Sequence, residues 1–358
     1  MATIGDLFHV KAGGDFNSAN SSLEQSEQFP FPVYANGLEN RGLYGFTNCA
    51  QCEAGAITVT ARGTLGVAFY RDTPFTAIGR LLVLQPKNEL DGRFFAEYIN
   101  IFVHFAVEST GVPQLTAPQI SRYKLPLPPL PEQRAIAAAL ADVDGLLAAL
   151  DDLLAKKRAV KTAAMQQLLT GKTRLPGFSG EWVTRRLGDL LVYERPDKYI
   201  VKDTDYRPQG QIPVLTANKS FILGYTDERF GICKNIPVIV FDDFTTDSKY
   251  VDFPFKVKSS AIKILRSRDN NRADLRFVYE LMQIIRFPIG DHKRYYIAEY
   301  QHIRLPVPTI DEQRAIAAVL SDMDAEIAAL EARREKVRQI KQGMMQVLLT
   351  GKVRLVTL

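Results

Sequence analysis

The residues in this chain that are most suggestive of metal-dependent chemistry lie between Asp242 and Lys249. Asp242-Asp243 precede Asp247-Ser248-Lys249, and carboxylates ahead of a carboxylate-x-lysine can bind Mg²⁺ and orient a water molecule in metal-dependent nucleases. The spacing is too short for ligands on two neighbouring strands, so one loop would carry all of them. A polar loop at a strand end is therefore the preferred interpretation, and a metal-dependent nuclease is the alternative.

Other motifs for chemistry are weak or missing. Cys49 and Cys52 form a C-x-x-C pair, but a structural zinc ion needs two further ligands and only Cys233 and four scattered histidines are left. We therefore expect ordinary thiols and no metal site. The chain contains no G-x-G-x-x-G or G-x-x-x-x-G-K-S/T loop and no Asp/Asn-Pro-Pro-aromatic signature of an amino-methyltransferase. The sequence thus predicts neither a bound cofactor nor catalysis by this chain.

Composition indicates a soluble globular protein, because 46% of the 358 residues are apolar and 24% are charged. No apolar run is long enough for a bilayer-spanning helix, and the N-terminus lacks a signal-peptide pattern. Three cysteines argue against a disulfide framework and favour a cytoplasmic location. A net charge of +5 permits a polyanionic partner without demonstrating one.

Two segments, Leu125–Leu175 and Leu305–Leu355, are near copies of each other. They align without a gap at an offset of 180 residues, and 28 of the 51 aligned positions are identical. The segments before each copy, residues 1–124 and 176–304, are far less alike, and we name them the variable segments. A chain that alternates variable and repeated parts duplicates a scaffold and lets the surfaces between diverge.

Each repeat predicts one long helix. Pro131 suits a first helical turn, Asp311 suits an N-cap, and Gly171 and Gly351 supply C-terminal stops. About 40 residues at about 1.5 Å each give a helix roughly 60 Å long. Apolar residues recur in steps of four and three, as in a coiled-coil seam. In the first repeat these residues are Ile136, Leu140, Val143, Leu147, Leu150 and Leu154, and the second repeat follows the same pattern from Ile316.

Charge is divided unevenly along both predicted helices. Glu132–Asp152 holds five acidic residues and one basic residue, whereas Lys156–Arg174 holds six basic residues and no acidic one. The second repeat has the same division on either side of Ala332. Exposed ion pairs are individually weak, but their summed sign favours antiparallel pairing of the two helices. The alternative is that each helix packs only on its own neighbouring domain.

The variable segments predict one α+β fold used twice. Strand signals occur at Ala56–Thr60, Gly79–Leu84, Ile236–Phe241 and Ser260–Leu265, and shorter helical patterns occur at Phe94–Phe105 and Leu275–Ile285. Ile4-Gly-Asp-Leu7 matches Leu187-Gly-Asp-Leu190, and Pro32–Asn36 resembles Pro213–Asn218. We therefore expect two α/β domains, residues 1–130 and 173–309, separated by helices in residues 131–172 and 310–358 that pair as an antiparallel coiled coil with pseudo-twofold symmetry.

This pattern resembles the DNA-specificity subunit of type I restriction-modification systems, on the strength of the Pro-rich Glu-Gln openings (Pro126–Gln133, Pro306–Gln313) and the Leu-Leu-Thr-Gly-Lys endings. The resemblance implies that each variable segment is a target-recognition domain for one half of a bipartite site in double-stranded DNA. It implies that the helices set the spacing and bind two modification (methyltransferase) subunits, with or without restriction subunits. Those methyltransferase subunits, rather than this chain, would bind S-adenosylmethionine. A coiled-coil scaffold without nucleic acid is a further alternative.

On this resemblance, the DNA-binding candidates are loop residues with cationic, hydroxyl, amide or aromatic side chains and one glycine that allows close approach to phosphate. They are Arg62, Gly63, Thr64, Gln114, Lys219, Thr245, Thr246, Lys249, Lys293, Arg294 and Tyr295. The alternatives are a plain β-turn at Ala61–Gly66 and a solvated surface loop at His292–Tyr296. The candidates for binding the partner subunits are the repeated Glu-Gln-Arg residues at the helix starts. They are Glu132, Gln133, Arg134, Glu312, Gln313 and Arg314.

Overall fold

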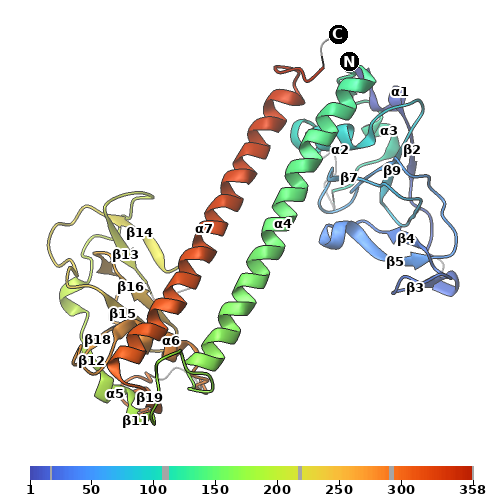
Figure 1. The fold of residues 1–358 in the computed structure, drawn as a ribbon. Helices are drawn as coiled ribbons and strands as arrows, with labels where there is room; N and C mark the ends of the chain where they lie inside the picture. The colour runs from blue at the N-terminus through green and yellow to red at the C-terminus, as the bar shows by residue number, and fades with distance from the viewer. Residues whose placement is uncertain (17, 107–112, 217–219, 290–293, 357–358) are drawn as a thin grey trace. The chain divides into compact units, whose positions relative to one another are not determined.

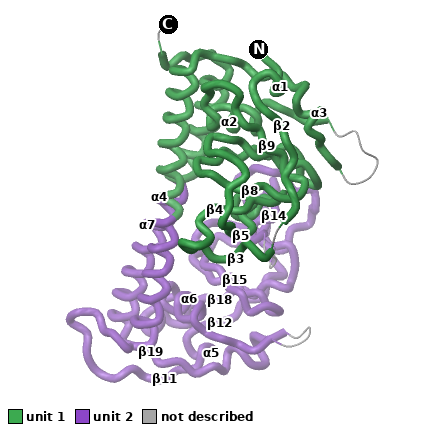
Figure 2. Tube along the Cα trace, turned by 90° about the vertical axis from the view of Figure 1, so that its right-hand side faces the viewer, with its two compact units in different colours: residues 1–151, 333–358 green, residues 152–332 purple. Residues whose placement is uncertain are grey.

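The computed structural model describes residues 1–16, 18–106, 113–216, 220–289 and 294–356. Contacts divide the chain into two compact units, which Figure 2 colours green and purple. Unit 1 is Met1–Asp151 with Arg333–Leu358, and unit 2 is Asp152–Ala332. Each unit therefore holds one variable segment with part of both repeated helices, whereas the sequence-based division gives each helix a segment of its own.

The long helices are α4, Leu130–Leu168, and α7, Ile310–Leu348, each of 39 residues (Figure 1). Both end a few residues before the predicted glycines, which have the positive φ angles of helix stops: 69° at Gly171 and 72° at Gly351. Asp311 lies inside the first turn of α7, so its prediction as the N-cap is wrong. Its carboxylate still lies where the helix dipole favours negative charge.

The two helices run antiparallel in both units. In unit 1, Lys341 lies 2.8 Å from Asp144 and Arg334 lies 2.7 Å from Asp151. Residue numbers therefore fall along α7 in the direction in which they rise along α4. In unit 2, Lys157 lies 2.6 Å from Glu326, and Lys161 lies 2.6 Å from Asp324. Each pair joins an acidic half to a basic half, which confirms the orientation predicted from the charge pattern.

The apolar seam is also confirmed, and it continues into the cores of the variable segments. Ile136 and Leu140 of α4 are buried in the core of unit 1, together with Leu348 of α7. The core of unit 2 likewise contains Leu168 of α4 together with Ile316 and Leu320 of α7. The helices thus pair with each other and also pack on a domain, so the alternative that each helix packs only on its own neighbouring domain is wrong.

Unit 1 contains two four-stranded sheets and a short strand pair. The first sheet has the order β2-β9-β6-β7 and the second the order β3-β5-β4-β8. Helix α2 packs against β6 and β7 of the first sheet. The element bounds are β1 Ala2–Thr3, α1 Ile4–Leu7, β2 Phe8–Ala12, β3 Ser21–Ser22, β4 Phe31–Tyr34, β5 Leu43–Thr47, β6 Ile57–Val59, β7 Ala68–Tyr70, β8 Thr76–Ala77, β9 Leu82–Pro86, α2 Gly92–Phe102, α3 Ala117–Ile120 and β10 Lys124–Leu125.

Unit 2 repeats the first sheet with the order β12-β18-β15-β16, and its second sheet, β14-β13-β17, matches the β5-β4-β8 part of the second sheet of unit 1. The matching segments found in the sequence fall on equivalent elements, because Ile4–Leu7 is α1 and Leu187–Leu190 is α5. One α+β fold is therefore used twice, as predicted. The element bounds are β11 Val183–Arg186, α5 Leu187–Leu190, β12 Leu191–Glu194, β13 Ile212–Leu215, β14 Ile222–Thr226, β15 Val238–Asp242, β16 Ser248–Val251, β17 Lys256–Val257, β18 Ile262–Ser267, α6 Leu275–Gln283 and β19 Arg304–Val307.

The short helices α2 and α6 form for the same local reasons. Asp91 and Asp274 are their N-caps, and each side chain accepts a hydrogen bond from the backbone N–H three residues later. Each helix then buries one apolar face against its sheet, through Phe94 and Phe95 in α2 and through Phe277 in α6. In the described part of the chain, no helix is both long and apolar enough to cross a membrane.

The charge pairing of α4 with α7 can be tested in unit 2 by reversal. Lys157→Glu with Arg158→Glu replaces two attractions, to Glu326 and Glu331, by repulsions. We expect the free energy of unfolding to fall by about 1–2 kcal/mol, since exposed pairs contribute little individually. Adding Glu326→Lys and Glu331→Lys should restore thermal stability at low salt, and a quadruple variant no more stable than the double variant would contradict the pairing.

Candidate nucleic-acid interface

The loop between β6 and β7 presents Arg62, Gly63 and Thr64 to solvent. Asn36, two residues after β4, holds its base: the Asn36 Oδ1 accepts from the backbone N–H of Ala61 at 2.6 Å, and its Nδ2 donates to the Arg62 carbonyl at 2.7 Å. Gly63 has a φ of 73°, a left-handed conformation that favours glycine. A loop held at its base and open at its tip can place a guanidinium and a hydroxyl against a ligand.

Gln114 lies beside this loop, as the backbone pairing of Arg62 with Gln114 shows. Gly63 N–H donates to the Pro113 carbonyl at 3.2 Å. The cleft on this surface has a volume of about 480 Å³ and is lined by Arg62, Gly63 and also Arg80. Arg80 was missed in the sequence, although its Gly79-Arg80 turn pairs a glycine with an arginine as Arg62-Gly63 does.

The loop between β15 and β16 carries Thr245 and Thr246, and Lys249 follows it in β16. Asp242 organises the turn, since its Oδ1 accepts from the N–H of Phe244 at 2.8 Å and its carbonyl accepts from the N–H of Thr246 at 3.0 Å. Thr245 and Lys249 are exposed. Thr246 and Lys249 line a cavity of about 310 Å³.

The aspartates of this segment have structural tasks instead of a shared metal-binding arrangement. Asp242 holds the turn, while Asp243 is only 2% exposed and accepts a hydrogen bond from the Tyr296 N–H at 2.8 Å. Asp243 also lies 3.2 Å from Lys263 Nζ. Among the described residues, no group of three or more His, Cys, Asp or Glu could hold a metal ion. Nothing here supports the nuclease alternative.

The two loops occupy equivalent places in the two units. Each joins the third and fourth strands of its sheet, in the orders β2-β9-β6-β7 and β12-β18-β15-β16. Each also has a neighbouring segment paired to it, because Tyr295 N–H donates to the Asp243 carbonyl at 3.0 Å where Gln114 pairs with Arg62 in unit 1. The candidate loops therefore form one duplicated surface feature, although the sequence patterns that suggested them differ.

Not every predicted DNA-binding residue lies on that surface. Tyr295 is only 2% exposed, and its ring packs 5.2 Å from that of Phe287, so its prediction as a surface contact is wrong. An aromatic residue beside lysine and arginine suggests a solvent-exposed loop, but Tyr295 is part of the core of unit 2. Arg294 is exposed and lies over the Phe244 ring. Lys219 and Lys293 lie outside the described residues.

The repeated glutamines at the helix starts are buried, so their prediction as partner-binding residues is wrong. Gln133 and Gln313 are each 1% exposed. Gln133 accepts from the Asp91 N–H at 3.0 Å and donates to the Pro128 carbonyl at 2.8 Å. Gln313 accepts from the Asp274 N–H at 2.9 Å in the same way. Each glutamine thus fastens the start of a long helix to the N-cap of α2 or α6.

The repeated glutamates are buried as well, and their assignment to partner binding is also wrong. Glu132 accepts hydrogen bonds from the N–H groups of Leu355 and Val356 at 3.1 and 3.0 Å and pairs with Arg354 at 3.2 Å. Burial raises the pKa of Glu132, but these donors outweigh burial and hold the pKa below its ordinary value. Glu312 accepts two 2.5 Å hydrogen bonds from Arg174.

Only the arginines of the two motifs face solvent. The side chain of Arg134 is 59% exposed and pairs with Glu89 at 2.6 Å. The side chain of Arg314 is 53% exposed. Sequence identity between the repeats therefore reflects internal fastening at the glutamate and the glutamine, and only the arginine is placed to contact another molecule.

Comparison with known proteins points to one family. The family model of the "Type I restriction modification DNA specificity domain" matches residues 1–156 and 179–339. The specificity subunit of the type I restriction enzyme EcoR124I/EcoR124II from Escherichia coli is 46% identical over 153 residues, which span 42% of this chain and 37% of that protein. The putative MjaX specificity subunit from Methanocaldococcus jannaschii is 24% identical over 323 residues, 81% of this chain and 76% of that protein.

A solved structure shares the fold. The crystal structure of the type I restriction-modification S subunit from M. genitalium has a TM-score of 0.72 to this chain, at 16% identity, and the match covers 97% of this chain and 94% of that one. At this identity the likeness concerns the fold alone.

Replacing Gln133 should affect stability more than assembly. Gln133→Ala removes the acceptor of the partly buried Asp91 N–H, which costs about 1 kcal/mol of folding free energy. Arg134→Ala, on the exposed neighbour, is the matched control and should change stability by less than about 0.5 kcal/mol. Thermal unfolding measures both, and equal stability of the two variants would contradict the fastening role.

Glu132 should contribute a pH-dependent part of the stability. Because its folded-state pKa is depressed below the ordinary 4.5, its stabilisation is present above that pH and is lost as the pH falls through the folded-state value. Glu132→Gln should therefore unfold at a lower temperature than the wild type at pH 7. The difference should shrink below pH 4.5, whereas a constant difference down to low pH would contradict the charge-dependent role.

Proposed function

The chain belongs to the type I restriction-modification DNA specificity family, and we propose that it is the non-catalytic subunit that reads a bipartite site in double-stranded DNA. In this proposal, each variable segment reads one half-site with its hairpin loop. The observation that carries it is the duplicated hairpin, with Arg62 and Thr64 in one unit and Thr245 and Lys249 at the equivalent place in the other. Arginine and hydroxyl side chains bind base edges, and lysine binds phosphate.

The different contents of the two loops support two different half-sites. The β6–β7 loop offers a guanidinium that can bind O6 and N7 of guanine. The β15–β16 loop offers two threonines, whose hydroxyl groups can bind several bases. A shared backbone frame with unlike side chains is what two unlike sequences, read by one fold, require.

We assign the chemistry to the partner subunits. The methyl transfer and its S-adenosylmethionine belong to methyltransferase subunits, since the chain has neither the loop that cradles a cofactor nor the amino-methyltransferase signature. This chain would position two such subunits on the DNA, with or without restriction subunits. The proposed role is therefore recognition and assembly.

The surfaces for those subunits follow from exposure on the long helices. In unit 2, Leu153 and Val160 are seven residues apart on α4 and are 38% and 48% exposed. In unit 1, Ile340 on α7 is 49% exposed. Apolar residues at heptad spacing on a helix that is already paired suit a further helix from a partner. Of the repeated Glu-Gln-Arg residues, the exposed Arg134 and Arg314 remain as candidates for polar contacts with the partner subunits.

Exchange of one variable segment tests the proposal. Replacing residues 1–124 by the equivalent segment of a family member with another target should change one half of the methylated motif and leave the other half unchanged, because each hairpin reads independently. The reciprocal exchange of residues 176–304 is the control and should change the opposite half. Methylation of genomic DNA by the assembled complex is the readout, and a single exchange that alters both halves would overturn independent reading.

A further inference from the structure

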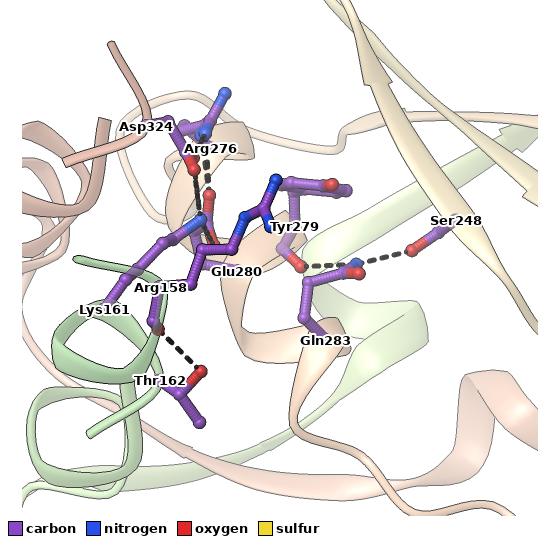
Figure 3. Close-up of polar contacts among 9 residues, drawn as sticks. All are labelled: Arg158, Lys161, Thr162, Ser248, Arg276, Tyr279, Glu280, Gln283 and Asp324. Atoms are coloured by element: carbon purple, nitrogen blue, oxygen red, sulfur yellow. Dashed lines mark hydrogen bonds and ion pairs between the residues drawn. The ribbon is translucent and has the colours of Figure 1, made fainter. Parts of the chain in front are cut away.

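A cluster of ion pairs in unit 2 joins three helices (Figure 3). Lys161 of α4 lies 2.6 Å from Asp324 of α7 and 3.4 Å from Glu280 of α6. Arg276 of α6 lies 2.5 Å from the same Asp324 and 2.8 Å from Glu280. Two cations and two carboxylates thus alternate around the place where α6 meets the helix pair.

Because Glu280 is buried, its carboxylate depends on the neighbouring cations for stabilisation. Its side chain is 0% exposed, whereas those of Lys161 and Arg276 are 16% and 23% exposed. Oε2 of Glu280 has no hydrogen bond, so the nearby Lys161 ammonium is its compensation. A buried carboxylate is costly without its cations. Apolar packing between helices is non-directional, and charge-assisted contacts of this kind specify one geometry.

The same helix also holds the recognition hairpin. One turn after Glu280, the Gln283 Nε2 donates to the Ser248 Oγ at 2.8 Å (Figure 3). Ser248 is the first residue of β16, directly before Lys249 and directly after the β15–β16 loop. Helix α6 therefore links the two sites: the ion pairs join it to the helix pair, and one turn later Gln283 joins it to the base of the loop that is proposed to read DNA.

Unit 1 contains a corresponding path, in which the glutamate is less buried: the side chain of Glu97 is 22% exposed. Lys341 of α7 lies 2.8 Å from Asp144 of α4 and 3.7 Å from Glu97 of α2. Three residues after Glu97, the Asn100 side chain accepts from the Ala68 N–H at 2.8 Å and donates to the Ala68 carbonyl at 2.9 Å. Ala68 opens β7 and pairs with the end of β6, as Ser248 opens β16 and pairs with β15.

The contact between the short helix and the last strand of the sheet lies at the same position in both units, but different groups make it. Asn100 binds the backbone of the first residue of β7, and Gln283 binds a side-chain hydroxyl on the first residue of β16. The two units therefore share a hydrogen bond from the short helix to the first residue of β7 or β16, although the residue types differ. A path that occurs twice in different chemical form is hard to attribute to chance packing.

We propose that this duplicated path, here named the relay, positions each recognition hairpin on the helix pair and thereby limits the spacer length that the protein accepts. The inference rests on the proposed function. Successive base pairs are about 3.4 Å apart, so a hairpin that shifts by that distance can read a half-site displaced by one base pair. Glu97, Asn100, Glu280 and Gln283 are then positioning residues, since they act on DNA through the hairpins.

The test uses the full chain assembled with its methyltransferase subunits. The substrates are duplexes that carry the wild-type motif with its native spacer or with one base pair added or removed. Lys161→Met and Glu280→Gln should raise methylation at the altered spacers, relative to the native spacer, by about tenfold, which corresponds to loss of one charge-assisted hydrogen bond. Lys161→Arg keeps the charge and should restore the wild-type discrimination.

The matched control is Arg158→Met. Arg158 lies one turn before Lys161 and pairs with Glu331 of α7 at 2.5 Å, so its loss removes an ion pair between the same helices and keeps the contacts of Lys161 with α6. Its discrimination between spacers should equal that of the wild type. Equal loss of methylation at every spacer in Lys161→Met would mean a merely structural role and would overturn the relay.

The hairpin end of the relay gives a second test that leaves every ion pair intact. Gln283→Met should lower the selectivity for the half-site that unit 2 reads and leave the other half-site unaffected. Asn100→Leu should do the same for the half-site that unit 1 reads. Unchanged motifs in both variants would overturn the proposal even if the Glu280 variant fails to fold. A wild-type complex that methylates no bipartite motif would refute the proposed function and the relay together, whereas a bipartite motif with unaltered variants would refute the relay only.

Discussion

The antiparallel direction of the two repeated helices is the constraint on which the rest of the structure depends. Each helix is acidic in its first half and basic in its second, so opposite charges face each other only when the helices run in opposite directions, as in the Asp144–Lys341 and Lys161–Asp324 pairs. Such pairs are weak one by one, but they agree in sign. Because of this direction, the start of one helix and the end of the other share a core within each unit.

The sequence predicted the parts of the structure that depend on periodicity and charge. Long helices, their orientation and a twice-used α+β fold follow from patterns within the chain itself. The helix bounds, the ion pairs between the helices and the strand orders of the two units confirm them. The Arg62 and Lys249 loops were found because glycine, threonine and lysine near strand ends indicate surface turns. That they are equivalent hairpins required the strand order, since the two loops share no sequence pattern.

The predictions that were wrong have one physical cause: whether a polar residue is buried depends on partners that are remote in the sequence. Glu132 and Gln133 look like surface residues at a helix start, yet their partners are Leu355, Val356 and Asp91. Tyr295 looks like part of a basic loop, yet its ring packs on Phe287. Identity between repeats indicated that the glutamate and glutamine matter, but whether they face a partner or the interior was decided by contacts that the local pattern does not contain.

Reading of two half-sites by two equivalent hairpins of one chain can be tested by sequencing methylated bases in cells with and without this chain. We expect that a single bipartite motif, with two fixed half-sites and a fixed spacer, is methylated only when the chain is present. Methylation that is unchanged by removal of the chain, or a motif that is continuous instead of bipartite, would contradict it.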